Sequence, residues 1–215
     1  MSASVMHELA SLLQHFSMVA FDLEPLALAH AQEPEVIESI RGARDASERI
    51  LSLFRQLRTF VAGKKPEAER LLVTTVIQHA VDLCRGFARP RVIRVDLGDA
   101  AGASVDGDLA LLTQVLVNLF RNAVDATTRE GNIDLALWFE DDFVCVAVTD
   151  DGPGVPEALR ARLFVPFATS KEPSAGSGLG LALSAMIVRE HRGELVYETA
   201  AGGGARFVVR LRRAG

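Results

Sequence analysis

Residues 150–154 read Asp-Asp-Gly-Pro-Gly, and residues 176–181 read Gly-Ser-Gly-Leu-Gly-Leu. The first glycine cluster follows a strand-like run at 144–149, and the second begins an amphipathic helix at 179–191. Glycine at the end of a strand lets a ligand come close to the backbone, because no Cβ atom stands in the way. Glycine at the start of a helix leaves free N–H groups beside the positive end of the helix dipole. Together the two clusters predict a site for a phosphorylated ligand, with a mobile segment between them.

The composition indicates a soluble globular protein of one or two domains, with 215 residues, a formal net charge of −5 and 49% hydrophobic residues. The sequence has no basic cluster of the kind that binds nucleic acid. It has no apolar run long enough to span a bilayer and no signal-peptide pattern. Cys84 and Cys145 lack the spacing of metal ligands, so we interpret them as reduced core cysteines. These features predict a cytoplasmic protein with no nucleic-acid partner and no membrane segment.

Two heptad-patterned helices are predicted at the N-terminal end of the chain. Apolar residues recur in alternating steps of four and three over 5–26, and again over 36–61. A turn at Pro34 separates the two runs. Such a hairpin carries more apolar surface than two helices can bury, so the domain at 1–66 is predicted to dimerise into a four-helix bundle.

His7 falls on the face of the first helix that lies away from the heptad seam, and Glu8 follows it. A histidine held out to solvent keeps its ring nitrogens free to react, and an adjacent carboxylate orients the ring or takes its proton. The alternative is an ordinary surface histidine, which the His-Glu pair taken alone favours; only the rest of the chain reverses this preference. The ordinary interpretation also fits His15, His30, His79 and His191.

A second domain is predicted at 67–215, where helical and strand patterns alternate. Helices are predicted at 72–87, 108–128 and 179–191, the second capped by Asp108. Strands are predicted at 91–97, 132–139, 143–149, 194–199 and 205–212, and a loop at 99–107. Short turns between neighbouring strands favour a mixed, largely antiparallel sheet with helices on one face. The predicted fold class is therefore α+β, a helical hairpin followed by an α/β sandwich.

Asn118 and Asn122 are one turn apart on the predicted helix 108–128, so they share one of its faces. Asparagine is a middling helix former, and two on one face need partners. Amide oxygens suit a hard cation such as Mg²⁺, and amide N–H groups suit phosphate oxygens. Alternatively, the two side chains cap or bridge neighbouring backbone. The pair by itself supports both interpretations equally.

Four segments, 112–126, 150–154, 163–171 and 176–181, resemble the N, G1, F and G2 boxes of the ATP-binding domain of sensor histidine kinases. That domain belongs to a superfamily shared with DNA gyrase, mismatch-repair ATPases and a heat-shock chaperone. The hairpin resembles the dimerisation and histidine-phosphotransfer domain of the same kinases, and His7-Glu8-Leu9 resembles their H box. The resemblance implies a two-component protein histidine kinase that uses ATP and Mg²⁺.

The resemblance also implies a role for each matching position. Asp150 accepts a hydrogen bond from the adenine amino group, and Gly152 and Gly154 let the chain turn beneath the base. Asn122 binds Mg²⁺, with Asn118 beside it near the phosphates. The segment between Gly152 and Gly178 corresponds to the ATP lid of the family. The other nucleotide-binding positions lie in this lid or at the helix start: Thr169, Lys171, Gly176, Gly178, Leu179 and Gly180. Asp151 replaces the Asn that is commoner in the family, which we expect to be tolerated.

Asn118 distinguishes kinase from hydrolase chemistry. Hydrolytic members of the superfamily carry at this position a Glu that activates water, and an amide is not a useful general base. The resemblance therefore implies that His7 accepts the γ-phosphoryl group, with Glu8 as the candidate base. The phosphohistidine then passes the group to an Asp of a response-regulator receiver domain. Ser11, one turn past His7, occupies the place that supports reverse phosphatase activity in related kinases.

The partners implied are a second copy of the chain and a receiver domain. Only six residues precede His7, so the sensor is either a separate protein or a part that this sequence does not include. One alternative is a histidine phosphotransfer relay whose kinase-like domain is a scaffold that does not use ATP. The intact glycines of both clusters and Asp150 argue against it. Another alternative is a Ser/Thr kinase of the same superfamily, whose members generally lack the two-helix front.

Overall fold

A computed structural model of the chain describes residues 69–88, 91–128, 130–166, 168 and 178–215. All of them belong to one structural unit, Lys65–Gly215. The predicted helical hairpin, with His7, Glu8 and Ser11, lies outside the described residues. The same holds for three predicted lid positions, Thr169, Lys171 and Gly176.

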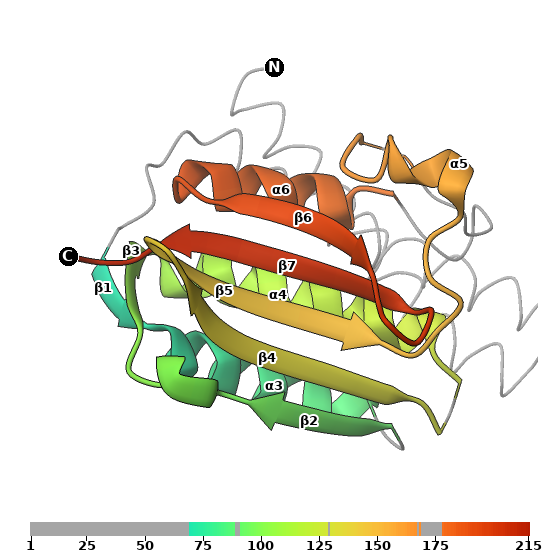
Figure 1. Cartoon of the computed structure of the whole chain (residues 1–215), viewed down its shortest axis with the longest axis horizontal. Coiled ribbons are helices and arrows are strands. Elements are labelled where there is room, and N and C mark those ends of the chain that lie inside the picture. Colours follow the sequence, from blue (N-terminus) through green and yellow to red (C-terminus); the bar gives the residue numbers. More distant parts are fainter. Residues whose placement is uncertain (1–68, 89–90, 129, 167, 169–177) are drawn as a thin grey trace, which may run out of the picture. The chain divides into compact units, whose positions relative to one another are not determined.

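A five-stranded sheet forms the centre of the unit, in the order β2-β4-β5-β7-β6 (Figure 1). Its strands are β2 (Val92–Asp96), β4 (Asn132–Glu140), β5 (Phe143–Asp150), β6 (Glu194–Thr199) and β7 (Ala205–Arg212). Strands β2 and β4 are parallel, and the other three pairs are antiparallel. The predicted mixed, largely antiparallel sheet is confirmed. The antiparallel pairs β4–β5 and β6–β7 arise because each is joined by a short turn.

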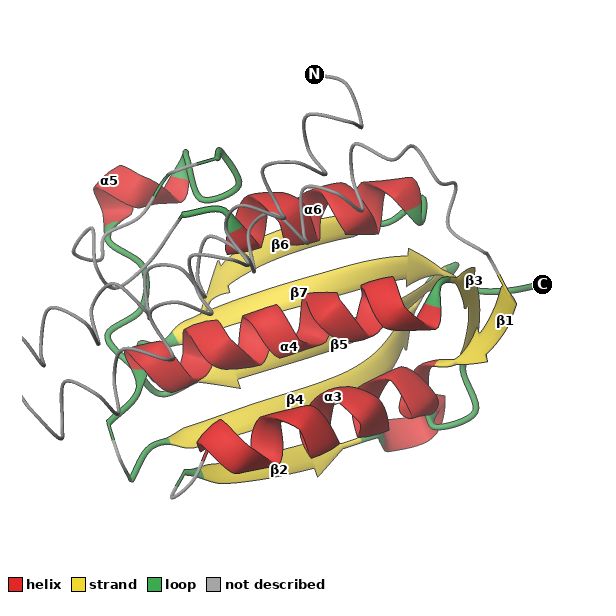
Figure 2. Cartoon of the chain, turned by 180° about the vertical axis from the view of Figure 1, so that it is seen from behind, coloured by secondary structure: helices red, strands yellow, loops and turns green. Residues whose placement is uncertain are grey.

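Three helices cover one face of this sheet, as Figure 2 shows: α3 (Val73–Ala88), α4 (Leu109–Ala126) and α6 (Gly180–Glu190). Each was predicted from its apolar spacing, because residues three and four apart face the same side of a helix. Asp108 caps α4, and its carboxylate accepts a hydrogen bond from the N–H of Leu111 at 3.0 Å. This bond satisfies one of the N–H groups that a helix start leaves without an internal partner.

The core lies between the helices and the sheet, and its largest fully buried side chains come from both layers. They include Phe120 and Leu119 of α4, and Ile133 and Leu135 of β4. Burial of one such side chain stabilises the fold by roughly 1.5–3 kcal/mol. The central part of α4 is therefore held firmly against the sheet, and it carries Asn118 and Asn122.

A second, two-stranded antiparallel sheet differs from the prediction. It pairs β1 (Glu69–Leu72) with β3 (Ser104–Gly107), and a 3₁₀ turn at Gly98–Ala100 precedes β3. The prediction of a loop at 99–107 was therefore wrong. Leu71 and Val105 are register partners, and both are buried. A four-residue strand shows too little alternation to be recognised, and its pairing depends on a distant segment.

A short helix, α5 (Glu157–Arg160), lies between the two glycine clusters. The sequence had shown no clear helical or strand period in this segment. One turn of helix is too short to produce one. Within the described part of the chain, no helix is both long and apolar enough to cross a membrane.

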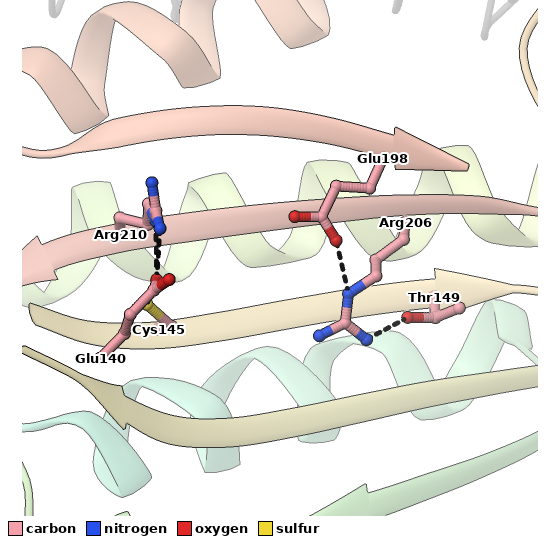
Figure 3. Close-up of polar contacts among 6 residues, drawn as sticks. All are labelled: Glu140, Cys145, Thr149, Glu198, Arg206 and Arg210. Atoms are coloured by element: carbon pink, nitrogen blue, oxygen red, sulfur yellow. Dashed lines mark hydrogen bonds and ion pairs between the residues drawn. The ribbon is translucent and has the colours of Figure 1, made fainter. Parts of the chain in front are cut away.

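On the other face of the sheet, long charged side chains pair with one another across the strands, as Figure 3 shows. Arg210 donates from Nε to Glu140 at 3.0 Å, and Arg206 donates from Nε to Glu198 at 3.1 Å. Arg206 also lies over the ring of Trp138, with 5.0 Å from its guanidinium carbon to the ring centroid. These contacts shield the middle of the face from water.

Both cysteines are buried and free, as predicted. Burial raises the pKa of the Cys84 thiol to about 11. Burial, followed by a hydrogen bond to Glu140, raises the pKa of the Cys145 thiol to about 11 as well. Both thiols therefore stay protonated and unreactive at neutral pH.

Candidate nucleotide site

Helix α4 brings the two glycine clusters together. A Cβ atom on Gly180, the first residue of α6, would lie 2.4 Å from Oδ1 of Asn118. A Cβ atom on Gly152 would lie 2.7 Å from the carbonyl oxygen of Ala126, the last residue of α4. Real Cβ atoms do not come so close to other atoms, so both glycines permit close packing on α4. The face of α4 between these contacts carries Asn122.

Asn118 forms a hydrogen bond with Ser184, a residue that the sequence analysis did not identify. Its Nδ2 donates a hydrogen bond to Oγ of Ser184 at 2.9 Å. Ser184 is only 2% exposed, although it is polar. The partner of the Asn118 amide N–H₂ is therefore a distant side chain and not the neighbouring backbone, and Oδ1 of Asn118 lies beside Gly180. The sequence did offer one sign of this role, because Ser184 is a small polar residue on the face of α6 that is buried.

Asn122 differs from Asn118, because its Nδ2 is buried and has no hydrogen-bond partner among the residues that the structure describes. A buried donor without a partner costs about 1–3 kcal/mol. Such a group fits a site whose partner is a ligand. The carbonyl oxygen of the same amide is the type of ligand that Mg²⁺ takes in proteins, together with phosphate oxygens and water. The side chain of Asn122 therefore fits its predicted role.

Asp150, the last residue of β5, is a buried carboxylate, 5% exposed. Its Oδ1 accepts two backbone hydrogen bonds, from the N–H of Gly152 at 3.0 Å and from the N–H of Ala205 at 3.2 Å. No described residue donates to its Oδ2. Burial raises the pKa of this carboxyl above its usual range, against the two N–H groups, which lower it. Asp150 is thus an oriented acceptor with one oxygen left for a ligand.

Asp151 connects the first glycine cluster to the start of β4. Its Oδ2 accepts hydrogen bonds from the side-chain Nδ2 of Asn132 at 2.9 Å and from the backbone N–H of Asn132 at 2.8 Å. These bonds, the side-chain one first, lower the pKa of the Asp151 carboxyl. Asp151 therefore has a local structural partner, in agreement with the expectation that it is tolerated.

The other two described glycines of the clusters, Gly154 and Gly178, occupy backbone conformations that other residues rarely adopt. Gly154 has φ +73° and Gly178 has φ +65°. Gly178 is followed by Leu179, which is the N-cap residue of α6. The described part of the second cluster therefore lies at a helix start, as predicted.

His191 corrects one prediction, because it is buried and not an ordinary surface histidine. Its Nδ1 donates to the carbonyl oxygen of Ile187 at 2.7 Å, and its Nε2 accepts from the N–H of Asp108 at 3.0 Å. The Nδ1 bond holds the ring against the last turn of α6, and the Nε2 bond fastens it to the start of α4. His191 is a structural residue.

A separate groove of about 1100 Å³ runs between α3 and α4. It is lined by Glu69, His79, Asp82, Leu83, Asp108, Leu109, Ala110, Thr113, Gln114 and Val117. None of the predicted site residues that the structure describes lines it, so the groove is distinct from the site at Asp150 and Asn122. Within the described ranges, no group of three or more His, Cys, Asp and Glu side chains is arranged to hold a metal ion.

Comparison with known families places this geometry in context. The profile of the family described as histidine kinase-, DNA gyrase B-, and HSP90-like ATPase matches residues 107–215. The match begins at the last residue of β3 and includes α4, Asp150 and the start of α6.

Individual relatives are sensor proteins of bacteria. The C4-dicarboxylate transport sensor protein DctS of Rhodobacter capsulatus is 35% identical over 164 residues, which cover 74% of this chain and 25% of DctS. The sensor protein FixL of Bradyrhizobium diazoefficiens is 33% identical over 178 residues, which cover 81% of this chain and 35% of FixL. The chain thus spans only a quarter to about a third of the length of these two relatives.

Solved structures agree with the fold. The mycobacterial sensor histidine kinase MprB matches with a TM-score of 0.61 and 26% identity. The match covers 68% of this chain and 97% of the MprB chain.

Proposed function

This chain belongs to the histidine kinase-, DNA gyrase B- and HSP90-like ATPase family, and we propose that it is an ATP-dependent protein histidine kinase of two-component signalling. One observation carries the proposal: α4 contacts both glycine clusters and carries Asn122 between those contacts, with its buried Nδ2 unpartnered among the described residues. The sensor relatives support the kinase role, as does Asn118, an amide where hydrolytic members have a Glu.

The nucleotide site is built from the described residues and the lid. Asp150 accepts a hydrogen bond from the adenine amino group through Oδ2, since both backbone donors occupy Oδ1. A carboxylate in this place repels a carbonyl group, and it therefore selects adenine over guanine. The other contacts to the nucleotide come from Gly152, Gly154, Thr169, Lys171, Gly176, Gly178, Leu179 and Gly180.

Asn122 supplies the protein oxygen for Mg²⁺, and Asn118 lies beside it near the phosphates. The bound ion neutralises charge on the transferring phosphoryl group. Lys171 reaches the phosphates as a mobile point charge. The N–H groups at the start of α6, near Gly178 and Gly180, face the phosphate oxygens.

The chemical step is a transfer of the γ-phosphoryl group to His7. A bond forms between a ring nitrogen of His7 and the γ-phosphorus. The bond from that phosphorus to the bridging oxygen breaks, and ADP leaves with the electron pair. Glu8 takes the proton that the ring nitrogen carried. The phosphoryl group then moves from His7 to an Asp carboxylate of a receiver domain.

The N-terminal segment completes the proposal. Residues 1–66 form the dimerising helical hairpin, and residues 67–215 form the catalytic domain. Dimerisation into a four-helix bundle covers the two heptad seams. Ser11, one turn past His7, supports the reverse phosphatase reaction. The protein acts in the cytoplasm.

The test is incubation of the chain with radiolabelled ATP and Mg²⁺, followed by acid treatment of the labelled protein. The wild type should acquire acid-labile phosphate, and His7→Ala should acquire none. His79→Ala is the matched control and should label normally, because His79 lies in the groove between α3 and α4. Undiminished acid-labile label on His7→Ala contradicts the assignment of the acceptor. A wild type that binds no ATP supports the relay alternative.

A further inference from the structure

The turn between β6 and β7 lies at the same end of the sheet as the end of β5 (Figure 1). β7 pairs with β5, and Arg206 is the register partner of Thr149, so the turn lies directly beside Asp150. Two hydrogen bonds close the turn. The N–H of Gly203 donates to the carbonyl of Ala200, and the N–H of Ala200 donates to the carbonyl of Gly204, both at 2.9 Å. Asp150 therefore has an ordered backbone segment as its neighbour.

Gly204 touches the backbone of Asp150. A Cβ atom on Gly204 would lie 1.7 Å from the carbonyl oxygen of Asp150, 2.6 Å from its carbonyl carbon and 3.1 Å from its Oδ1. The first two atoms are backbone, so no side-chain rotation relieves the clash. β5 is held on both sides by β4 and β7. Any side chain at position 204 must therefore displace Asp150 or the turn.

The next residue holds the carboxylate itself. The N–H of Ala205 donates to Oδ1 of Asp150 across 55 residues of sequence. Gly152, two residues after Asp150, donates to the same oxygen. Because both donors lie on Oδ1, they set the rotation of the carboxylate. That rotation leaves Oδ2 for a group that does not belong to the described residues.

We propose that Gly204 and the backbone N–H of Ala205 are positioning groups that determine adenine specificity, because they orient Oδ2 of Asp150 toward the base. The inference rests on the proposed function, in which Asp150 recognises the adenine amino group. It extends that function by assigning nucleotide specificity to the β6–β7 turn, a segment that supplies no ligand contact of its own.

The experiment compares binding of ATP with binding of purine riboside 5′-triphosphate, which lacks only the 6-amino group. Calorimetry on the full chain with Mg²⁺ gives the ratio of the two affinities. In Gly204→Ala this ratio should fall by about 10- to 100-fold, the equivalent of one hydrogen bond to a charged group. Affinity for the analogue should change by less than about threefold, because it makes no such bond.

Gly202→Ala is the matched control in the same turn. A Cβ atom on Gly202 meets no atom within 4 Å, so this variant should keep the wild-type ratio. A general loss of order in the domain would lower the affinity for both nucleotides together and leave the ratio of the two affinities unchanged. The ratio therefore separates a positioning role from a purely structural one.

A second variant covers the case in which Gly204→Ala does not fold. Lactic acid in place of Ala205 replaces the amide by an ester and removes the N–H without adding bulk. It should lower the same ratio. A wild type with equal affinity for both nucleotides contradicts the adenine role of Asp150, and hence the proposed function. A wild type that prefers ATP, with full preference retained in the folded variants, overturns the inference alone.

Discussion

Asn118 and Ser184 form a hydrogen bond between α4 and α6, with 2.9 Å between Nδ2 of Asn118 and Oγ of Ser184. The two residues are 66 positions apart in sequence. Ser184 lies one turn after Gly180, where α6 begins and the lid ends. The bond therefore fastens the start of α6 to the helix that carries Asn122.

Ser184→Ala removes this bond and leaves the Asn118 amide without its buried partner. We expect the free energy of unfolding to fall by about 1–3 kcal/mol. Urea denaturation followed by Trp138 fluorescence measures this, because Trp138 is the only tryptophan in the sequence and reports on β4. An unchanged unfolding midpoint would show that the bond contributes nothing.

Thr113→Val, in α4, should have the opposite effect on stability. Oγ1 of Thr113 is buried and has no hydrogen-bond partner in the structure. Valine has nearly the same shape and buries no polar atom. The free energy of unfolding should therefore stay constant or rise by up to about 1 kcal/mol in the same urea assay. A loss as large as that of Ser184→Ala would mean that the hydroxyl has a partner.

Asp150→Asn should raise the stability of the fold at neutral pH while it weakens ATP binding. Burial raises the pKa of the Asp150 carboxyl above its ordinary value of 3.8, so ionisation opposes folding. The wild type therefore loses stability as the pH rises from 3.8 through the raised pKa. Asp150→Asn lacks this loss, so it should be the more stable protein at neutral pH. The two should converge as the pH falls to 3.8 and below.

The same substitution should weaken ATP binding by about 10- to 100-fold, because the amide N–H₂ does not accept a hydrogen bond from adenine. Urea denaturation across this pH range and calorimetry with ATP are the two measurements. An advantage of Asp150→Asn that grows as the pH falls would reverse the sign and contradict the argument.

Asn122→Ala should remove the dependence of ATP binding on Mg²⁺. In the wild type, the ATP affinity measured with Mg²⁺ should exceed that measured with EDTA. The ratio of the two should fall about tenfold or more in the variant, because the protein oxygen on the ion is lost. Stability should change little, since the Nδ2 of Asn122 has no partner to lose.

Gln114→Ala is the control for this experiment. Gln114 lies two turns earlier in α4 and lines the groove between α3 and α4. It should retain the wild-type response to Mg²⁺. An equal loss in both variants would point to a general change in α4 and not to a metal ligand.

Local periodicity in the sequence determined most of the elements. The bounds of β6 and β7 agree with the prediction residue for residue, and those of α3, α4 and α6 agree within two residues. The cap at Asp108 was also predicted. These features follow from near neighbours, because apolar spacing and capping residues act within a turn or two of their own position.

The sequence also determined which residue types form the site, since two glycine clusters, an acidic residue and two amides indicate a nucleotide. Tertiary structure alone decided how those residues are held. Asp150 takes its donor from Ala205, Asn118 takes its partner from Ser184, and β1 finds β3. Each of these contacts joins segments that lie far apart in sequence. Their existence depends on the path of the whole chain through the sheet, which no local pattern encodes.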